Sequence, residues 1–141
     1  MRTSKEAKNK IKEFEGLRLS AYKCPAGVWT IGYGHTGGVV RGTTITKERA
    51  DELLDHDLLR YESEISKIQG LSQHQFDALV SFTFNVGISN FLKSTLRKKV
   101  MMNPSNSTIP NEFLKWKYAG GKVLQGLVER RKWEAEWWGG E

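Results

Sequence analysis

The order of apolar and polar residues divides the chain into a short first helix, a glycine-rich middle segment and a long helical remainder. Ala7 and Ile11 fall on one face of a helix that we expect over residues 4–13. A capping box at Thr3–Glu6 would start this helix, and Gly16 would end it.

The segment that follows changes from a helical period to alternation of apolar and polar residues. Pro25–Gly27 signals a turn, and Val28–His35 predicts a strand. Gly37–Gly38 and Gly42 mark further turns. We therefore expect a small β-sheet of two or three short strands.

Helical spacing returns at Thr46, the expected cap of the next helix. The clearest start signal is the pair Ser72 and Gln75, which can cap each other ahead of a segment that Gly87 ends. That segment is apolar almost all round, which is typical of the most buried helix of a domain. The other helices expected here span residues 46–68, 89–101, 111–118 and 127–138.

These elements predict one α+β domain over residues 1–141. A small β-containing lobe would occupy about residues 14–45, and a mainly helical lobe about residues 46–141, with the helix 4–13 packed on it. A cleft between the two lobes is the expected place for a ligand.

Composition and charge limit the possible functions. No apolar run approaches the roughly 20 residues of a spanning helix, and the first residues lack the apolar core of a secretion signal. The single cysteine excludes an internal disulfide, and with three scattered histidines it makes no zinc pattern, so we expect neither metal nor cofactor. The net charge of +6 favours polyanions such as nucleic acid, anionic lipid or a bacterial wall, without choosing among them.

Three side chains suited to hydrolysis stand close together: Glu15, Cys24 and Thr30. Partial burial of Glu15 at the junction of helix and sheet would favour the protonated carboxyl that a general acid needs. A period of two places Thr30 on the same strand face as Gly32 and Gly34. These glycines either leave a smooth floor for a polymer, with Thr30 holding a water, or simply permit a twisted hairpin.

Cys24 leaves a second interpretation open, because a cysteine peptidase would pair it with His35, His56 or His74. Against this, a turn rather than a helix follows the cysteine, and a nearby carboxylate would discourage the thiolate. His35 closes the strand on the face opposite the threonine and is expected to be a hydrogen-bonded structural residue. A third class, a non-catalytic basic binding module, needs no such spacing, and no nucleic-acid motif is present.

The last expected helix carries Arg130 and Arg131. The spacing of Arg130 from Glu134, like that of Lys132 from Glu136, indicates a partly solvated helix face. One of the two arginines could still turn inward.

The motif Glu-x8-(Asp/Cys)-x5-Thr, within EGLRLSAYKCPAGVWTIGYGHT at residues 15–36, closely resembles the phage-type lysozymes and endolysins of glycoside hydrolase family 24. The similarity extends to LSQHQFDALVSFTFNVG at 71–87 and GLVERRKWE at 126–134. It implies a lysozyme-like fold and hydrolysis of the β-1,4 bond between N-acetylmuramic acid and N-acetylglucosamine in peptidoglycan.

The resemblance also implies roles for individual residues. Glu15 would be the general acid, Thr30 would position the attacking water, and one of Arg130 or Arg131 would pair with Glu15. Residues implied to line the glycan site are Gly32, Gly34, Thr36, Phe84 and Asn85, with His35 in support.

Cys24 departs from the family pattern, since many members have aspartate there. A thiol with a pKa of about 8.5 is only slightly ionised at pH 7, and a nearby carboxylate would raise that pKa further. Cys24 would either help to orient water, giving inversion at the anomeric carbon, or attack the sugar, giving retention. We favour inversion with Cys24 in a supporting role.

The expected partner is the glycan strand of peptidoglycan, bound by a monomer that has no stable membrane anchor. Since no export signal is evident, the enzyme is expected to accumulate in the host cytoplasm until a separate membrane lesion admits it to the wall.

Overall fold

The computed structural model describes residues 1–140, which divide into two compact units. The first, which we call the β-unit, is Lys8–Arg60, and the second, the helical unit, joins Met1–Ala7 to the chain from Tyr61 onward. Both boundaries fall inside helices, α1 (Lys5–Glu15) and α2 (Lys47–Ile65), rather than near residue 45. That the whole chain is one domain stays a prediction.

Helix α1 begins one residue later and ends two residues further on than its sequence pattern indicates. Gly16 follows it with a φ of +75°, a left-handed conformation that other residues adopt only at a cost. The predicted capping box is wrong at its first position. Ser4 accepts the Ala7 amide at 3.2 Å, whereas Thr3 makes its bonds elsewhere.

The sheet of the β-unit is an antiparallel pair, β1 (Arg18–Lys23) and β2 (Trp29–Gly32). The predicted strand is therefore too long at its end, because the chain turns after Gly32 and His35 bridges back to Ile31. A third segment adds only an isolated bridge, between Ser20 and Thr44. In α2, Thr46 accepts the Arg49 amide at 3.1 Å, which confirms the predicted cap.

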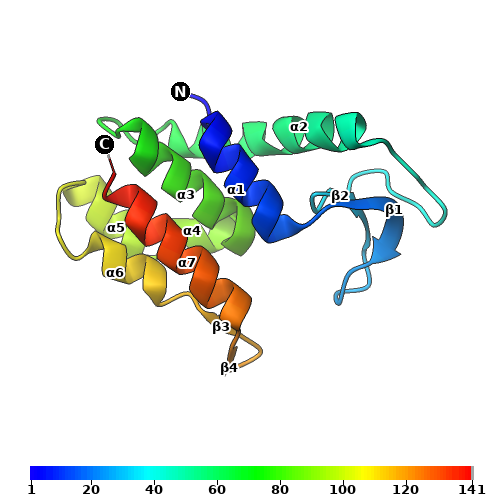
Figure 1. The fold of residues 1–141 in the computed structure, drawn as a ribbon. Helices are drawn as coiled ribbons and strands as arrows, with labels where there is room; N and C mark the ends of the chain where they lie inside the picture. The colour runs from blue at the N-terminus through cyan, green and yellow to red at the C-terminus, as the bar shows by residue number, and fades with distance from the viewer. Residues whose placement is uncertain (141) are drawn as a thin grey trace. The chain divides into compact units, whose positions relative to one another are not determined.

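The helical unit is built around α3 (Gln73–Val86), which lies beside α7 (Gln125–Trp138) in Figure 1. Ser72 and Gln75 form the predicted capping box, and Gly87 ends the helix. All residues from Phe76 to Thr83 are buried, which confirms the prediction that this is the most buried helix. The remaining elements are α4 (Ile88–Lys93), α5 (Thr95–Met102), α6 (Ile109–Leu114), β3 (Tyr118–Ala119) and β4 (Lys122–Val123).

An aromatic cluster forms the centre of this unit. The ring of Phe82 meets the rings of Phe113 and Trp116 edge-on, each with centroids 5.5 Å apart. Phe113 in turn contacts Trp138, which is 5% exposed. Edge-to-face aromatic pairs add to the hydrophobic stabilisation of burial, so these contacts fix α6 and α7 against α3.

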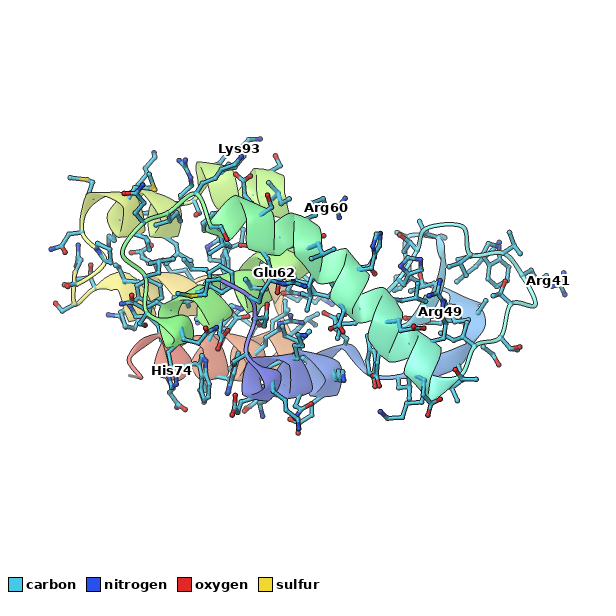
Figure 2. All side chains as sticks on the ribbon, turned by 90° about the horizontal axis from the view of Figure 1, so that it is seen from above. Arg41, Arg49, Arg60, Glu62, His74 and Lys93 are labelled. Carbon is cyan, nitrogen blue, oxygen red and sulfur yellow. The ribbon has the colours of Figure 1, made fainter. Side chains whose placement is uncertain are left out.

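Two buried carboxylates hold the first residues of the chain, an arrangement that we call the N-terminal clamp. Glu62, labelled in Figure 2, accepts the Thr3 amide at 2.8 Å and its hydroxyl at 2.6 Å. Asp77 accepts the Ser4 amide at 2.9 Å and its hydroxyl at 2.6 Å. Trp137 also donates its indole N–H to Asp77, at 3.1 Å. A buried carboxylate without hydrogen-bond donors is costly. Glu62 and Asp77 therefore need the donors of the N-terminal residues, and those residues are in turn held in place by the two carboxylates.

Several features of the helical unit differ from the predictions. The helix expected over residues 111–118 is α6, which ends at Leu114. The helix expected over residues 89–101 is two helices, because Ser94 ends α4 and caps α5 by accepting the Arg97 amide at 3.0 Å. The hairpin of β3 and β4 was not predicted. Its turn is Gly120–Gly121, both with positive φ, as tight hairpins require.

The arginines of α7 correct a further expectation in part. Arg130 is 3% exposed, and Arg131 and Glu134 are fully buried, so their side of the helix is not solvated. Lys132 and Glu136 are exposed, as expected of a partly solvated helix. Arg131 Nε lies 2.7 Å from Glu134 Oε1, while the Ser81 hydroxyl donates to Glu134 Oε2 at 2.6 Å. Burial raises the pKa of Glu134, and the two guanidinium groups oppose that rise.

No helix within residues 1–140 is long and apolar enough to cross a membrane.

Candidate functional site in the β-unit

Glu15 is the last residue of α1 and is half-buried. Its carboxylate lies against the turn that follows β2, since a Cβ on Gly34 would be 3.2 Å from Glu15 Oε1. Gly34 has a φ of +84°. Both facts favour glycine here, because a side chain would strain the backbone and crowd the carboxylate.

Cys24 stands at the end of β1, where the hairpin turn begins. Its amide donates to the Val28 carbonyl at 3.0 Å, and its carbonyl accepts the Gly27 amide at 2.8 Å. This tight turn directs further backbone amides toward the sulfur.

Those amides change the ionisation of the thiol. Hydrogen bonds from the backbone of Val28 and then of Ala26 hold the pKa of Cys24 below its usual range, although burial opposes them. The expected upward shift of this pKa is therefore wrong in direction. Sequence reasoning weighed only the carboxylate of Glu15 and could not count backbone donors in a turn.

Thr30 faces Tyr22 across the sheet and is 4% exposed. Its hydroxyl donates to the Val28 carbonyl at 2.9 Å. Because a hydroxyl has one proton and two lone pairs, this leaves the Oγ1 lone pairs to accept a hydrogen bond. Thr30 thus links the turn that holds Cys24 to the strand that leads to Gly34.

His35 is fixed through both ring nitrogens. Nδ1 lies 2.8 Å from Asp57 Oδ2, and Nε2 lies 2.8 Å from the Gly37 carbonyl oxygen. Within residues 1–140 no hydrogen bond joins a histidine to Cys24, so the arrangement that a cysteine peptidase needs is not formed. The contact between His35 and Asp57 was not predicted. Asp57 lies on α2, 22 residues later, and nothing in the local sequence indicates that it would contact His35.

The other residues expected to line the glycan site near this strand are not equally exposed. Gly32 is buried, and a Cβ there would lie in ordinary contact with Ala50 and Ile45 at 3.5 Å, so its φ of +66° rather than a lack of space favours glycine. Thr36 is exposed in the following turn. Of the two glycines, Gly34 is the one beside the Glu15 carboxylate.

Two ion pairs inside the β-unit tie α1 to α2. Lys12 Nζ lies 3.0 Å from Asp51 Oδ1, and Lys8 Nζ lies 2.9 Å from Asp55 Oδ1. The hydrogen bond from Lys12 holds the pKa of Asp51 below its usual range. Sequence reasoning missed this pairing, although the equal spacing of four residues in both helices is a signal that could have found it.

The remaining predicted residues belong to the helical unit. Phe84 is half-buried and meets Tyr61 edge-on with centroids 5.1 Å apart, and Asn85 is exposed. Arg130 donates to the Ser81 carbonyl at 3.0 Å, and Arg131 binds Glu134. The pairing of either arginine with Glu15 stays a prediction. Across residues 1–140, no group of three His, Cys, Asp or Glu side chains is arranged to hold a metal ion.

Comparison with solved structures identifies the class of fold. The muramidase domain of SpmX from Asticaccaulis excentricus matches with a TM-score of 0.91 and 36% identity, over 99% of each chain. The chain therefore has a lysozyme-like α+β fold, as predicted from its sequence.

The family follows from sequence comparison. The phage lysozyme family model matches residues 12–134, and the chain belongs to that family. An endolysin of Acyrthosiphon pisum secondary endosymbiont phage 1 is 43% identical over 88% of each chain. An endolysin of Bacillus phage B103 is 44% identical over 95% of this chain, which spans only 52% of that relative's length.

Proposed function

We propose that this chain is an endolysin that hydrolyses the β-1,4 bond between N-acetylmuramic acid and N-acetylglucosamine in peptidoglycan. The observation that carries the proposal is the carboxylate of Glu15 set against Gly34 at the end of the hairpin that also holds Cys24 and Thr30. Membership of the phage lysozyme family supports the same reaction.

In this mechanism Glu15 protonates the glycosidic oxygen as the bond to the leaving sugar breaks. Thr30 accepts a hydrogen bond from the attacking water, because its own proton is given to Val28. Cys24 as a thiolate takes a proton from that water, and its lowered pKa supports this role. The product inverts at the anomeric carbon.

The decisive experiment measures two products from purified peptidoglycan: new reducing sugars and new free amines. We expect reducing sugars alone. Glu15→Gln should lose nearly all of this activity, since an amide cannot donate the acid proton, while Glu13→Gln is the matched control on the exposed side of the same helix turn. Release of reducing sugars by Glu15→Gln at the wild-type rate would contradict the proposal. Release of free amines by the wild type would favour a peptidase.

The stereochemistry is tested on a defined glycan by NMR of the anomer first released. Inversion predicts the α-anomer. A β-anomer appearing first would show retention and would make Cys24 the candidate nucleophile.

We also propose that the enzyme stays in the host cytoplasm until the membrane is breached. Expression without any other lysis protein should then leave cells intact, with the enzyme in the cytoplasmic fraction. Lysis by the enzyme alone would overturn this part of the proposal.

A further inference from the structure

A basic surface lies in the helical unit, outside the site described above. Residues 78–111 contain four basic side chains and no acidic one. Lys99 is used within the fold, since its Nζ lies 2.7 Å from Glu112 Oε2. The ion pairs of residues 1–140 leave Lys93, Arg97 and Lys98 without an acidic partner.

Apolar side chains are exposed among these charges. In α5 the buried residues are Leu96 and Val100, and the opposite face of the helix presents Lys98, Met101 and Met102 at spacings of three and four. Met102 is 87% exposed and Met101 is 51% exposed. Charged and apolar groups therefore share one outward face.

The preceding helix also ends in exposed side chains. Leu92 and Lys93 at the end of α4 are both exposed, and Lys93 extends outward from its helix in Figure 2. Beside α5 the surface is hollowed by a pocket of about 270 Å³. Its lining residues are Lys67, Ile68, Gln69, Val100, Met101 and Pro104.

We propose that this surface, defined as Leu92, Lys93, Arg97, Lys98, Met101 and Met102, binds reversibly to a bilayer that contains anionic phospholipids. Basic side chains are attracted to the anionic headgroups, and exposed apolar side chains enter the boundary between headgroups and acyl chains. A soluble polyanion would use the charges but leave the methionines in water. Only three of the six side chains are apolar, so the contact is weak and salt-sensitive.

The test is co-sedimentation of the full chain with vesicles of phosphatidylcholine alone or mixed with phosphatidylglycerol. Binding is expected only to the mixed vesicles, and it should weaken as salt is raised. Lys93→Gln/Lys98→Gln should weaken binding on the order of 30-fold, from about 1 kcal/mol per basic side chain near an anionic surface. The matched control is Lys5→Gln/Lys132→Gln, which removes the same charge from exposed positions elsewhere.

A second variant separates a bilayer from a soluble polyanion. Met101→Ser/Met102→Ser should lose several-fold in vesicle binding yet bind heparin as the wild type does. Equal vesicle binding by this variant, or no wild-type binding to mixed vesicles, would overturn the proposal. Release of reducing sugars from lipid-free peptidoglycan should be unchanged in all these variants, so the proposed hydrolase is tested separately.

Discussion

At the scale of single residues, the site depends on one glycine and one cysteine whose roles come from their backbone surroundings. Gly34 leaves room for the Glu15 carboxylate, and the turn after Cys24 supplies amides to the sulfur. The first effect comes from the absence of a side chain and the second from backbone amides, and a sequence motif describes neither. The motif therefore names the proposed reacting groups but not the surroundings that tune them.

Gly34→Ala should reduce kcat/KM by a factor on the order of 10², because displacing a catalytic group by a fraction of an ångström is costly. Gly38→Ala is the matched control: its φ of +70° imposes similar backbone strain, but no atom lies within 4 Å of its added methyl group. Both variants should lose about 1–2 kcal/mol of stability, measured by denaturant unfolding. Equal activity in the two would show that Gly34 does not shape the acid's position.

Cys24→Asp should keep substantial activity, since the amides that favour a thiolate also stabilise a carboxylate. Cys24→Ser should fall on the order of 10²-fold, because a hydroxyl stays protonated at neutral pH. Initial rates of reducing-sugar release compare the two. If the serine variant were as active as the wild type, a charge at this position would not be needed.

At the scale of elements, α1 carries the acid and is held to α2 by paired charges. The lowered pKa of Asp51 means that the folded state holds its carboxylate more firmly charged than the unfolded state does. This contribution to stability is present above the unfolded pKa of about 3.9 and is lost as pH falls through the lower folded value.

Lys12→Met should therefore lower the melting temperature by about 1–3 °C at pH 7, as expected of a partly exposed pair worth well under 1 kcal/mol. The difference from wild type should shrink as the pH is lowered from 7 to 2, through the lowered pKa of Asp51, and it should also shrink in high salt. Thermal unfolding at both pH values measures it. A difference that persists at pH 2 would point to lost packing on Tyr33, whose ring lies 5.7 Å from Lys12 Nζ.

The elements predicted correctly are those with local signals. The Ser72 and Gln75 box needs only four residues, and it fixed the start of α3. Ser94 breaks a helix whose two halves keep the same period, so periodicity could not find the break. Strands of two residues, as in β3 and β4, are too short to alternate.

At the scale of the whole molecule, burial is divided unequally between the units. Six of the nineteen buried apolar side chains of residues 1–140 belong to the β-unit, and the others belong to the helical unit. The burial of Arg130, Arg131 and Glu134 on α7 could not be predicted from their spacing. The same charge spacing suits a solvated or a buried network, and Ser81 and Phe82, about 50 residues earlier, decide between them.

Native-state hydrogen exchange should reveal this inequality. We expect amides of β2 to exchange at least about 10-fold faster than those of Phe76–Thr83, because fewer buried contacts oppose local opening. Equal protection of the backbone amides in both units would mean that the two units unfold together.

The N-terminal clamp ties the order of synthesis to the order of folding. Thr3 and Ser4 are translated before their acceptors Glu62 and Asp77, which lie 59 and 73 residues later. At about 5–20 residues per second, the donors wait roughly 3–15 s for those carboxylates to be made. During that time Ser4, which starts the helix bearing Glu15, has no Asp77 to bind. Both donors therefore exist for seconds before the chain contains the carboxylates that fix them.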